Sequence, residues 1–150
     1  MISIIADDLT GACDTAVKLC GKGRSIKVLM NWDTTKDMQI EQSHVVAFTT
    51  NTRSLQGMAA YDTVKKLVDS LKKYEWEMIY KKVDSLLRGN VAYELKAIMD
   101  SMNYSMAIVA PAIPDNGRLV IHGQIISSLE TSQGVDVLSC FGEPEEMKPA

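Results

Sequence analysis

The sequence is short of the features that mark membrane, secreted or nucleic-acid-binding proteins. No apolar run reaches about 18 residues, so no membrane span is predicted. The three cysteines are an odd number without a CxxC pair, which argues against a disulfide framework and a zinc site. The net charge of −3 comes without an arginine-rich stripe, so nothing favours nucleic acid as a partner. Met1–Ile5 has no basic region and predicts no secretory signal. We therefore expect a soluble, cytoplasmic protein.

Several motifs of well-defined chemistry are also missing. There is no GxxxxGKS, GxxxxGKT or GxGxxG loop, so ATP binding is not visible in the sequence. Asp7 and Asp8 are adjacent, which differs from the Asp-x-Asp pattern of phosphatases that form an aspartyl phosphate. His44 and His122 have no partner that suggests a catalytic triad or a metal site, and we interpret each as structural. No metal ligand set is predicted.

The length and composition predict one globular domain. A chain of 150 residues with 46% hydrophobic and 23% charged residues can bury a core and fold alone. The pattern weakens after Gly123, and Glu143–Ala150 is acidic and contains proline. We therefore interpret 1–150 as a single domain whose residues 124–150 form a weaker tail or the start of a linker.

Short β-branched runs alternate with longer helical periods along the chain. This alternation predicts βαβ units and an α/β fold: an open, mainly parallel sheet with helices on both faces, in a Rossmann-like three-layer arrangement. The predicted strands lie near residues 2–6, 26–30, 44–48, 77–82 and 106–110.

Three helices are predicted between these strands. The first runs over Gly11–Leu19, with Thr10 as its N-cap. The second runs over about Leu55–Lys73, and the third begins after Asn90. The inward stripe of the second helix is Leu55, Ala59, Ala60, Val64, Leu67, Val68 and Leu71, and that of the third is Val91, Leu95, Ile98, Met99 and Met102.

Three apolar runs stop at clusters of polar side chains, over residues 4–12, 81–90 and 108–118. Each reads as a strand end that runs into a loop. An open α/β sheet builds its ligand site from the loops at the carboxyl ends of its strands. The sequence therefore predicts a site for a small polar anion.

The first cluster places Asp7 and Asp8 beside the start of a helix, whose free N–H groups attract anions. One aspartate could orient or deprotonate a substrate hydroxyl. Adjacent side chains diverge at such a turn, so the two are not expected to do the same job. The alternative is that one aspartate caps the helix or pairs with a lysine.

The second cluster packs six candidate residues into nine positions. Arg88 can grip a carboxylate through two parallel N–H bonds, and Lys82 can act as a compact charge. Gly89 permits close approach of the backbone. The alternative is an ordinary turn with Asn90 as N-cap and a surface arginine. The six candidates are Lys82, Asp84, Ser85, Arg88, Gly89 and Asn90.

The third cluster combines prolines that stiffen a loop with the polar residues Asn116 and Arg118. Its alternative is a plain turn, because Pro-Asp-Asn-Gly is also a strong β-turn sequence. Between the first two clusters, Thr49–Ser54 offers hydroxyls and Arg53 after a predicted strand.

With these residues in view, the chain resembles the N-terminal domain of the four-carbon acid sugar kinases, formerly a domain of unknown function. The resemblance covers residues 1–123, and Leu86 stands where the family usually has threonine. The segments that carry it are Ile5-Ala6-Asp7-Asp8-Leu9-Thr10-Gly11-Ala12-Cys13-Asp14, Lys82-Val83-Asp84-Ser85-Leu86-Leu87-Arg88-Gly89-Asn90 and Ala110-Pro111-Ala112-Ile113-Pro114-Asp115-Asn116-Gly117-Arg118 with Gly123.

The resemblance implies ATP-dependent phosphorylation of a four-carbon sugar acid such as threonate, erythronate or a 3-oxo-tetronate, with this domain holding the acid. In the family a C-terminal domain, absent from this chain, carries most of the nucleotide site, and magnesium arrives with ATP. We expect in-line phosphoryl transfer, with Asp8 as the group that activates the hydroxyl and Asp84 in reserve. The expected substrate-binding residues are Asp7, Arg53, Lys82, Ser85, Arg88, Gly89, Asn90, Asn116 and Arg118.

Two other functions stay open. The chain could be a non-catalytic sugar-acid-binding module or a truncated gene product, which binds the acid but turns nothing over with ATP. It could also be a small magnesium-dependent sugar phosphatase. The ATP site would come from a missing domain or a partner chain, and neither nucleic acid nor membrane is an expected partner. The oligomeric state is left open.

Overall fold

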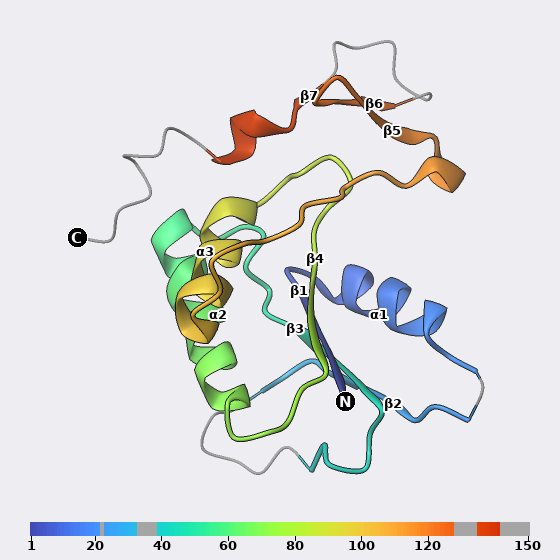
Figure 1. Ribbon diagram of the computed structural model, residues 1–150, viewed down its shortest axis with the longest axis vertical. Coiled ribbons are helices and arrows are strands. Elements are labelled where there is room, and N and C mark those ends of the chain that lie inside the picture. The colour runs from blue at the N-terminus through green and yellow to red at the C-terminus, as the bar shows by residue number, and fades with distance from the viewer. Residues whose placement is uncertain (22, 33–38, 128–134, 142–150) are drawn as a thin grey trace.

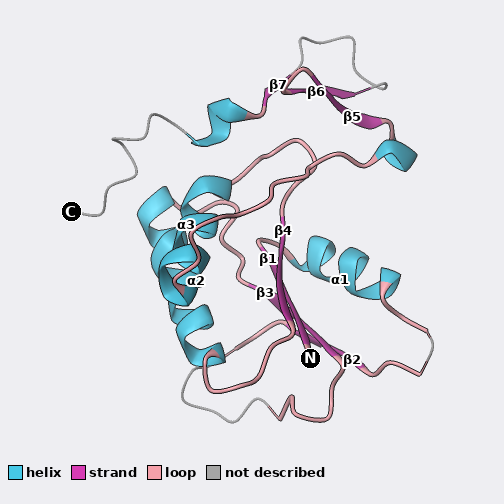
Figure 2. Ribbon diagram, viewed as in Figure 1, coloured by secondary structure: helices cyan, strands magenta, loops and turns pink. Residues whose placement is uncertain are grey.

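The computed structural model describes residues 1–21, 23–32, 39–127 and 135–141. Within these ranges, four parallel strands form the main sheet in the order β2-β3-β1-β4 (Figures 1 and 2). Both central strands therefore have a neighbour on each side, which suits their continuous apolar sequences. The strands are β1 (Ile2–Ala6), β2 (Ile26–Leu29), β3 (Val45–Thr49) and β4 (Met78–Lys82).

Helices cover both faces of this sheet. Figure 1 shows α1 (Leu9–Lys18) on one side and α2 (Gly57–Leu71) with α3 (Val91–Met102) on the other. Side chains of successive strand residues point to opposite faces. In β1, Ile4 packs with the α1 cluster and Ile5 with the cluster under α2 and α3. The predicted α/β fold with a parallel sheet is confirmed.

The first helix begins earlier than predicted, and its N-cap is Asp8 rather than Thr10. The backbone of Asp8 is extended (φ −142, ψ 163), and its carboxylate accepts a hydrogen bond from the backbone N–H of Gly11 at 2.6 Å. Thr10 lies inside the first turn. An aspartate caps a helix start as well as a threonine does, so the sequence alone did not separate the two.

The predicted stripe of α2 is confirmed except at its start, whereas the buried face of α3 is rotated from the prediction. Leu55 precedes α2 and is 40% exposed, and Ala59 is also exposed. In α3, Glu94 is buried where the pattern favoured Leu95, which is only half-buried. The reason is that α3 packs against α2 as well as against the sheet. Its fully buried positions are Val91, Ala92, Glu94, Ala97, Ile98 and Ser101.

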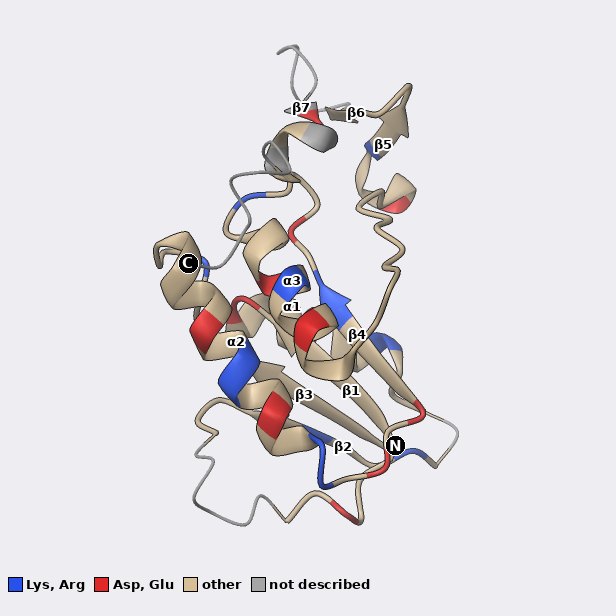
Figure 3. Ribbon diagram, turned by 60° about the vertical axis from the view of Figure 1, so that its left-hand side comes forward, with Lys and Arg blue, Asp and Glu red and all other residues tan. Residues whose placement is uncertain are grey.

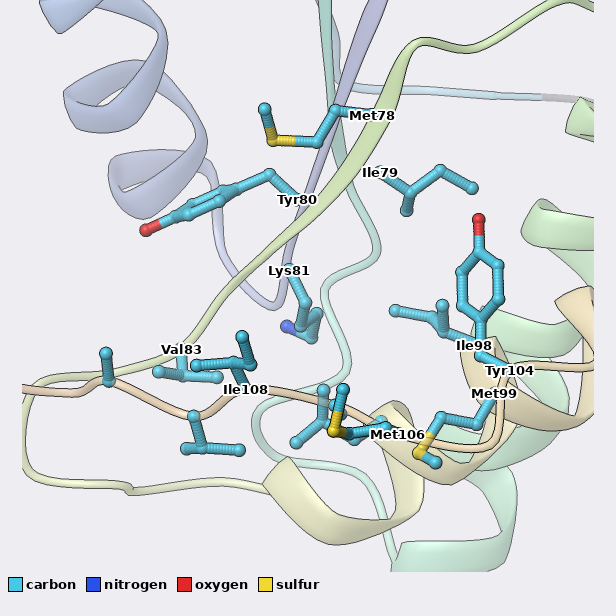
Figure 4. A pocket seen from close by; sticks show the side chains of 14 residues that line it. Met78, Ile79, Tyr80, Lys81, Val83, Ile98, Met99, Tyr104, Met106 and Ile108 are labelled. Atoms are coloured by element: carbon cyan, nitrogen blue, oxygen red, sulfur yellow. The ribbon is translucent and has the colours of Figure 1, made fainter.

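The strand predicted over 106–110 is wrong: this segment forms no strand. Met106 and Ile108 are 75% and 88% exposed. β4 is the edge strand of the main sheet. A groove of about 490 Å³ separates it from the segment over 106–110 (Figure 4). An apolar run shows that a segment can enter a sheet, but a strand also needs a ladder partner. Here Asn103 turns the chain in the left-handed region (φ 55) as α3 ends, and no ladder with β4 forms.

A second, antiparallel sheet lies on the side of the carboxyl ends of the main sheet (Figure 1). Ile125 packs with Leu87 and Val91, which ties this sheet to the start of α3. The tail or linker predicted for 124–150 therefore includes regular structure, and 128–134 and 142–150 lie outside the described residues. The elements are η1 (Pro114–Asn116), β5 (Arg118–Ile121), β6 (Gln124–Ser127), β7 (Val135–Asp136) and η2 (Leu138–Phe141).

No helix in the described ranges is long and apolar enough to cross a membrane.

The contact between α2 and α3 depends on a missing side chain. A Cβ added to Gly57 would lie 2.4 Å from Cε2 of Tyr93. We expect Gly57→Ala to lower the free energy of unfolding by about 1–2 kcal/mol, measured by urea denaturation, because the Tyr93 ring must move. In a Tyr93→Ala background the same substitution should be close to neutral. Equal effects in both backgrounds would contradict the contact.

Candidate functional site

The carboxyl ends of β1, β3 and β4 meet at a cluster of charged side chains centred on Arg53. Its guanidinium donates to both oxygens of Asp7, through Nε at 2.7 Å and Nη2 at 3.0 Å. Nη1 lies 2.6 Å from Asp8 Oδ2, and Nη2 lies 3.7 Å from Asp84 Oδ1. One arginine therefore joins carboxylates that come from two different strand ends.

Asp7 and Asp8 have different environments, as the sequence predicted for adjacent residues. The Asp7 side chain is 4% exposed and faces Arg53. The Asp8 side chain is 30% exposed and divides its oxygens between the Gly11 N–H and Arg53. Asp8 therefore caps the helix, as one alternative had it, and also belongs to the charged cluster.

Asp84 is held as a carboxylate in the loop after β4. Arg88 donates to its two oxygens through Nε and Nη2, both at 2.8 Å. The backbone N–H groups of Leu86 and Arg88 add bonds at 3.1 and 3.3 Å. Burial opposes ionisation of Asp84, but these hydrogen bonds outweigh it and lower its pKa to about 2.

The two arginines differ in what they offer a ligand. The Arg53 side chain is 32% exposed, and its hydrogen bond to Asp7 raises its pKa. The Arg88 side chain is 64% exposed, and its bond to Asp84 raises its pKa. Arg53 therefore acts as an internal clamp, while Arg88 presents an oriented guanidinium to solvent.

The loop between β4 and α3 brings further predicted residues to the cluster. Figure 3 shows the chain leaving the blue end of β4 and passing through a red and then a blue stretch. Lys82 is half-buried, and its ammonium donates to the Val83 carbonyl. Ser85 is half-buried in the same loop. These side chains lie at the site predicted from the second motif.

Gly89 and Asn90 fix how this loop meets its neighbours. Gly89 has φ +93, and a Cβ there would lie 3.2 Å from Asp7 Oδ2, so a side chain at this position would be both strained and crowded. Asn90 precedes α3, but its side chain does not cap the helix. Its Nδ2 instead donates to the carbonyls of Thr52 and Leu55 at 2.8 and 2.9 Å.

The third motif is not part of this cluster. Asn116 is exposed in η1, and Arg118 begins β5, where its guanidinium donates to Ser127 Oγ. Arg118 belongs to the second sheet, and Asn116 lies in η1 just before it. The sequence showed that the third motif follows an apolar run, but that run does not join the main sheet, so its end is not brought to the same edge.

Two buried charged residues next to the site, Lys81 and Glu94, were not among the predicted site residues, and Thr52 from the predicted Thr49–Ser54 segment contacts one of them. Lys81 and Glu94 form an ion pair at 2.7 Å with side chains only 5% and 1% exposed, and Thr52 donates to Glu94. Glu94 lies in the first turn of α3, and its carboxylate meets Lys81 of β4 and Thr52 of the loop after β3. Glutamate at such a position is usually solvated, so the pattern did not indicate burial.

The cluster contains positive and negative side chains that form ion pairs with one another. Asp7, Asp8 and Asp84 face Arg53 and Arg88. Such a site can bind a small anion through the exposed arginine and present a carboxylate to a ligand hydroxyl. Across the described ranges, no group of three or more His, Cys, Asp or Glu side chains is arranged to hold a metal ion.

The fold and site define a class: an open α/β domain with a cluster of charged side chains at the carboxyl ends of its parallel strands, the edge where such sheets bind ligands. The family follows from comparison. Residues 2–137 match the sugar-binding N-terminal domain family, and the chain belongs to that family. The match extends beyond residue 123, where the resemblance noted in the sequence ended.

The curated relatives are sugar-acid kinases. The chain is 36% identical over 125 residues to the D-threonate kinase of Bordetella bronchiseptica, covering 81% of this chain and 31% of that protein. It is 31% identical over 126 residues to the D-erythronate kinase of Heliobacterium modesticaldum, covering 83% of this chain and 29% of that protein. The predicted resemblance is confirmed, and the chain spans less than a third of these relatives' length.

A solved structure supports the same relationship. A domain of unknown function from Bordetella bronchiseptica matches with a TM-score of 0.81 and 29% identity, over 94% of this chain and 39% of that one. That protein was solved with bound citrate, as a domain-swapped dimer.

The lowered pKa of Asp84 predicts how stability depends on pH. A carboxylate whose pKa is lowered by folding stabilises the protein above its unfolded pKa of about 4, and this contribution is lost as the pH falls towards 2. We expect Asp84→Asn to remove about 2 kcal/mol of unfolding free energy at pH 7 and much less at pH 2. Urea denaturation at both pH values checks this, with the exposed Asp115→Asn as control. A loss independent of pH would contradict the assignment.

Arg53 is predicted to neutralise Asp7 in a buried setting. Arg53→Leu should lower the unfolding free energy at pH 7 by about 3 kcal/mol, because it leaves the Asp7 carboxylate buried without its partner. Adding Asp7→Asn should recover part of this loss, since the uncompensated charge is gone. Thermal or urea unfolding of the two single variants and the double variant measures the coupling. Additive losses would argue against the clamp.

Proposed function

We propose that this chain is the substrate-binding half of an ATP-dependent kinase that phosphorylates a hydroxyl of a four-carbon sugar acid, of the threonate, erythronate or 3-oxo-tetronate type. The family membership and the names of the relatives support this reading. The observation that carries it is the oriented, exposed guanidinium of Arg88 beside the three aspartates.

Arg88 is proposed to hold the carboxylate of the acid. Its bonds to Asp84 use Nε and Nη2, and the side chain is 64% exposed, so N–H groups on the solvent side can meet an anion. Lys82 and the positive end of α1 add attraction for negative charge. The citrate bound to the solved relative of 29% identity supports a site for carboxylates.

Asp8 is proposed to orient or deprotonate the attacking hydroxyl. Its side chain is 30% exposed, against 4% for Asp7 and 9% for Asp84, so it reaches a ligand most readily. Asp84 is a poor candidate base, because its pKa of about 2 leaves it little affinity for a proton at neutral pH. We assign Asp84 the task of orienting Arg88.

Phosphoryl transfer from ATP needs groups that we place outside this chain. Catalysis of this kind is mostly positioning and charge stabilisation, with the phosphoryl group in line between the two oxygens. ATP with its magnesium would be held by a further domain or a partner chain, and this half would present the hydroxyl. We further propose that the protein works in the cytoplasm, where exposed thiols such as Cys13 and Cys20 stay reduced.

A second reading is a non-catalytic module that binds the sugar acid. It differs from the first reading only in the absence of transfer from ATP. Both readings predict acid binding, whereas a small phosphatase would release phosphate from sugar phosphates without ATP.

Calorimetric titration of the purified chain with D-threonate and D-erythronate tests the shared proposal. We expect one acid to bind and to raise the melting temperature, with no phosphate release from sugar phosphates. Transfer from ATP only after addition of a nucleotide-binding chain would establish the kinase reading. Absence of binding to every acid in a folded sample would reject the function.

Arg88 provides the sharper test of the site. Arg88→Ala should abolish binding of the acid, and Arg88→Lys should weaken it at least about tenfold, because a lysine cannot pair with Asp84 through two N–H groups and still offer others to the acid. Arg24→Ala, an exposed arginine away from these strand ends, is the matched control and should bind normally. Unchanged affinity in folded Arg88→Ala would remove Arg88 from the site.

A further inference from the structure

A buried polar cluster lies next to the charged site without belonging to it. Lys81 Nζ and Glu94 Oε2 are 2.7 Å apart, and their side chains are 5% and 1% exposed. Figure 4 shows Lys81 projecting from β4. An ion pair this deeply buried contributes little net stability, because desolvation of the two charges offsets their attraction. Stability alone therefore gives little reason for its presence.

Hydrogen bonds extend this pair to the ends of β3 and β1. Thr52 Oγ1 donates to Glu94 Oε1, and Thr50 Oγ1 lies 2.7 Å from Thr52 Oγ1. The Thr50 N–H and the Thr50 hydroxyl both lie within hydrogen-bond distance of the Ala6 carbonyl, at 2.9 and 3.1 Å. The single Thr50 hydroxyl proton is therefore shared between the Ala6 carbonyl and Thr52 Oγ1. Thr52 and Lys81 both donate to Glu94, and Lys81 Nζ also donates to the Lys82 carbonyl at 2.8 Å.

Three residues of this hydrogen-bonded network are adjacent in sequence to charged residues of the site. Thr52 precedes Arg53, Lys81 precedes Lys82, and Ala6 precedes Asp7. Asn90, one turn before Glu94 in α3, holds the Thr52 carbonyl at 2.8 Å. Residues at the start of α3 therefore bind Thr52 at two points: Glu94 accepts from the Thr52 hydroxyl, and Asn90 donates to the Thr52 carbonyl.

We propose that Thr50, Thr52, Lys81 and Glu94 form a positioning cluster that sets the place of Arg53 and so the geometry of the anion site. The consequence for sugar-acid binding rests on the proposed function, while the effect on Arg53 does not. Arg53 needs such support because it must reach Asp7, Asp8 and Asp84 together. Its loop has no regular structure to hold it.

The first test follows Arg53 itself. Thr52→Val keeps the shape of the side chain but removes the hydroxyl, and Thr52→Ser restores it. Exchange of the Arg53 Nε proton, measured by NMR, should accelerate about tenfold or more in Thr52→Val, because the Asp7 bond is no longer held in register. It should be normal in Thr52→Ser. Thr63→Val, which removes a threonine hydroxyl bonded to Ala59 in α2, is the matched control.

A second variant covers the case in which Thr52→Val does not fold. Replacing both charges, as Lys81→Met with Glu94→Leu, avoids a lone buried charge and should leave the melting temperature unchanged or higher. Exchange at Arg53 should still accelerate. Lys65→Met, which removes an exposed ion pair with Asp69, is its control. Normal Arg53 exchange in whichever of these variants fold would overturn the positioning role.

The last measurement links the cluster to the ligand. Titration with D-threonate, at a temperature where each variant is fully folded, should show affinity about tenfold weaker in Thr52→Val and normal in Thr52→Ser. A purely structural role would lower the melting temperature and leave the affinity of folded molecules unchanged, which would refute the link. If the unmodified chain binds no sugar acid, the proposed function fails, and the exchange data still decide the placement of Arg53.

Discussion

The guanidinium of Arg53 is the interaction on which the arrangement of the site depends. The parallel sheet brings three strand ends to one edge, but two of them deliver aspartates that would repel one another. Arg53, from the third, lies within 4 Å of all three carboxylates and offsets part of their charge. Asp84 stays ionised through its own hydrogen bonds from Arg88 and from the backbone of Leu86, and it holds the exposed Arg88 in place. The internal salt bridge of Arg53 and the exposed guanidinium of Arg88 therefore share one group of carboxylates.

Below this salt bridge lies a second polar layer that is closed to solvent. Glu94 and Lys81 neutralise each other, and the threonines of the loop after β3 pass hydrogen bonds between them and β1. Each buried donor needs a partner, so the loop has few alternative positions. Long, flexible side chains such as that of Arg53 can be well ordered when the residues adjacent to them in sequence are fixed in this way.

The sequence predicted more of the fold than of the contacts within the site. The spacing of apolar residues identified the four strands of the main sheet and the three helices that cover it, because burial of one or two faces of an element requires apolar residues at regular positions. The segment over 106–110 has the same apolar pattern but forms no strand, because an apolar pattern does not show which neighbouring strand would supply the hydrogen bonds. Placement of Arg88 and Asp84 at a strand end was predictable, whereas the pairing of Arg53 with Asp7 joins residues far apart in the chain.

By itself the sequence determined the class of fold, the strand ends that carry chemistry and the family resemblance, because these depend on local periodicity and on short motifs. Only the tertiary structure decided which motifs meet. It joined the loop after β3 to those after β1 and β4, left Asn116 in η1 and Arg118 on a separate sheet, and buried Glu94 against Lys81. Such pairings follow from how strands are ordered and how helices rotate, and these are settled by packing the whole chain.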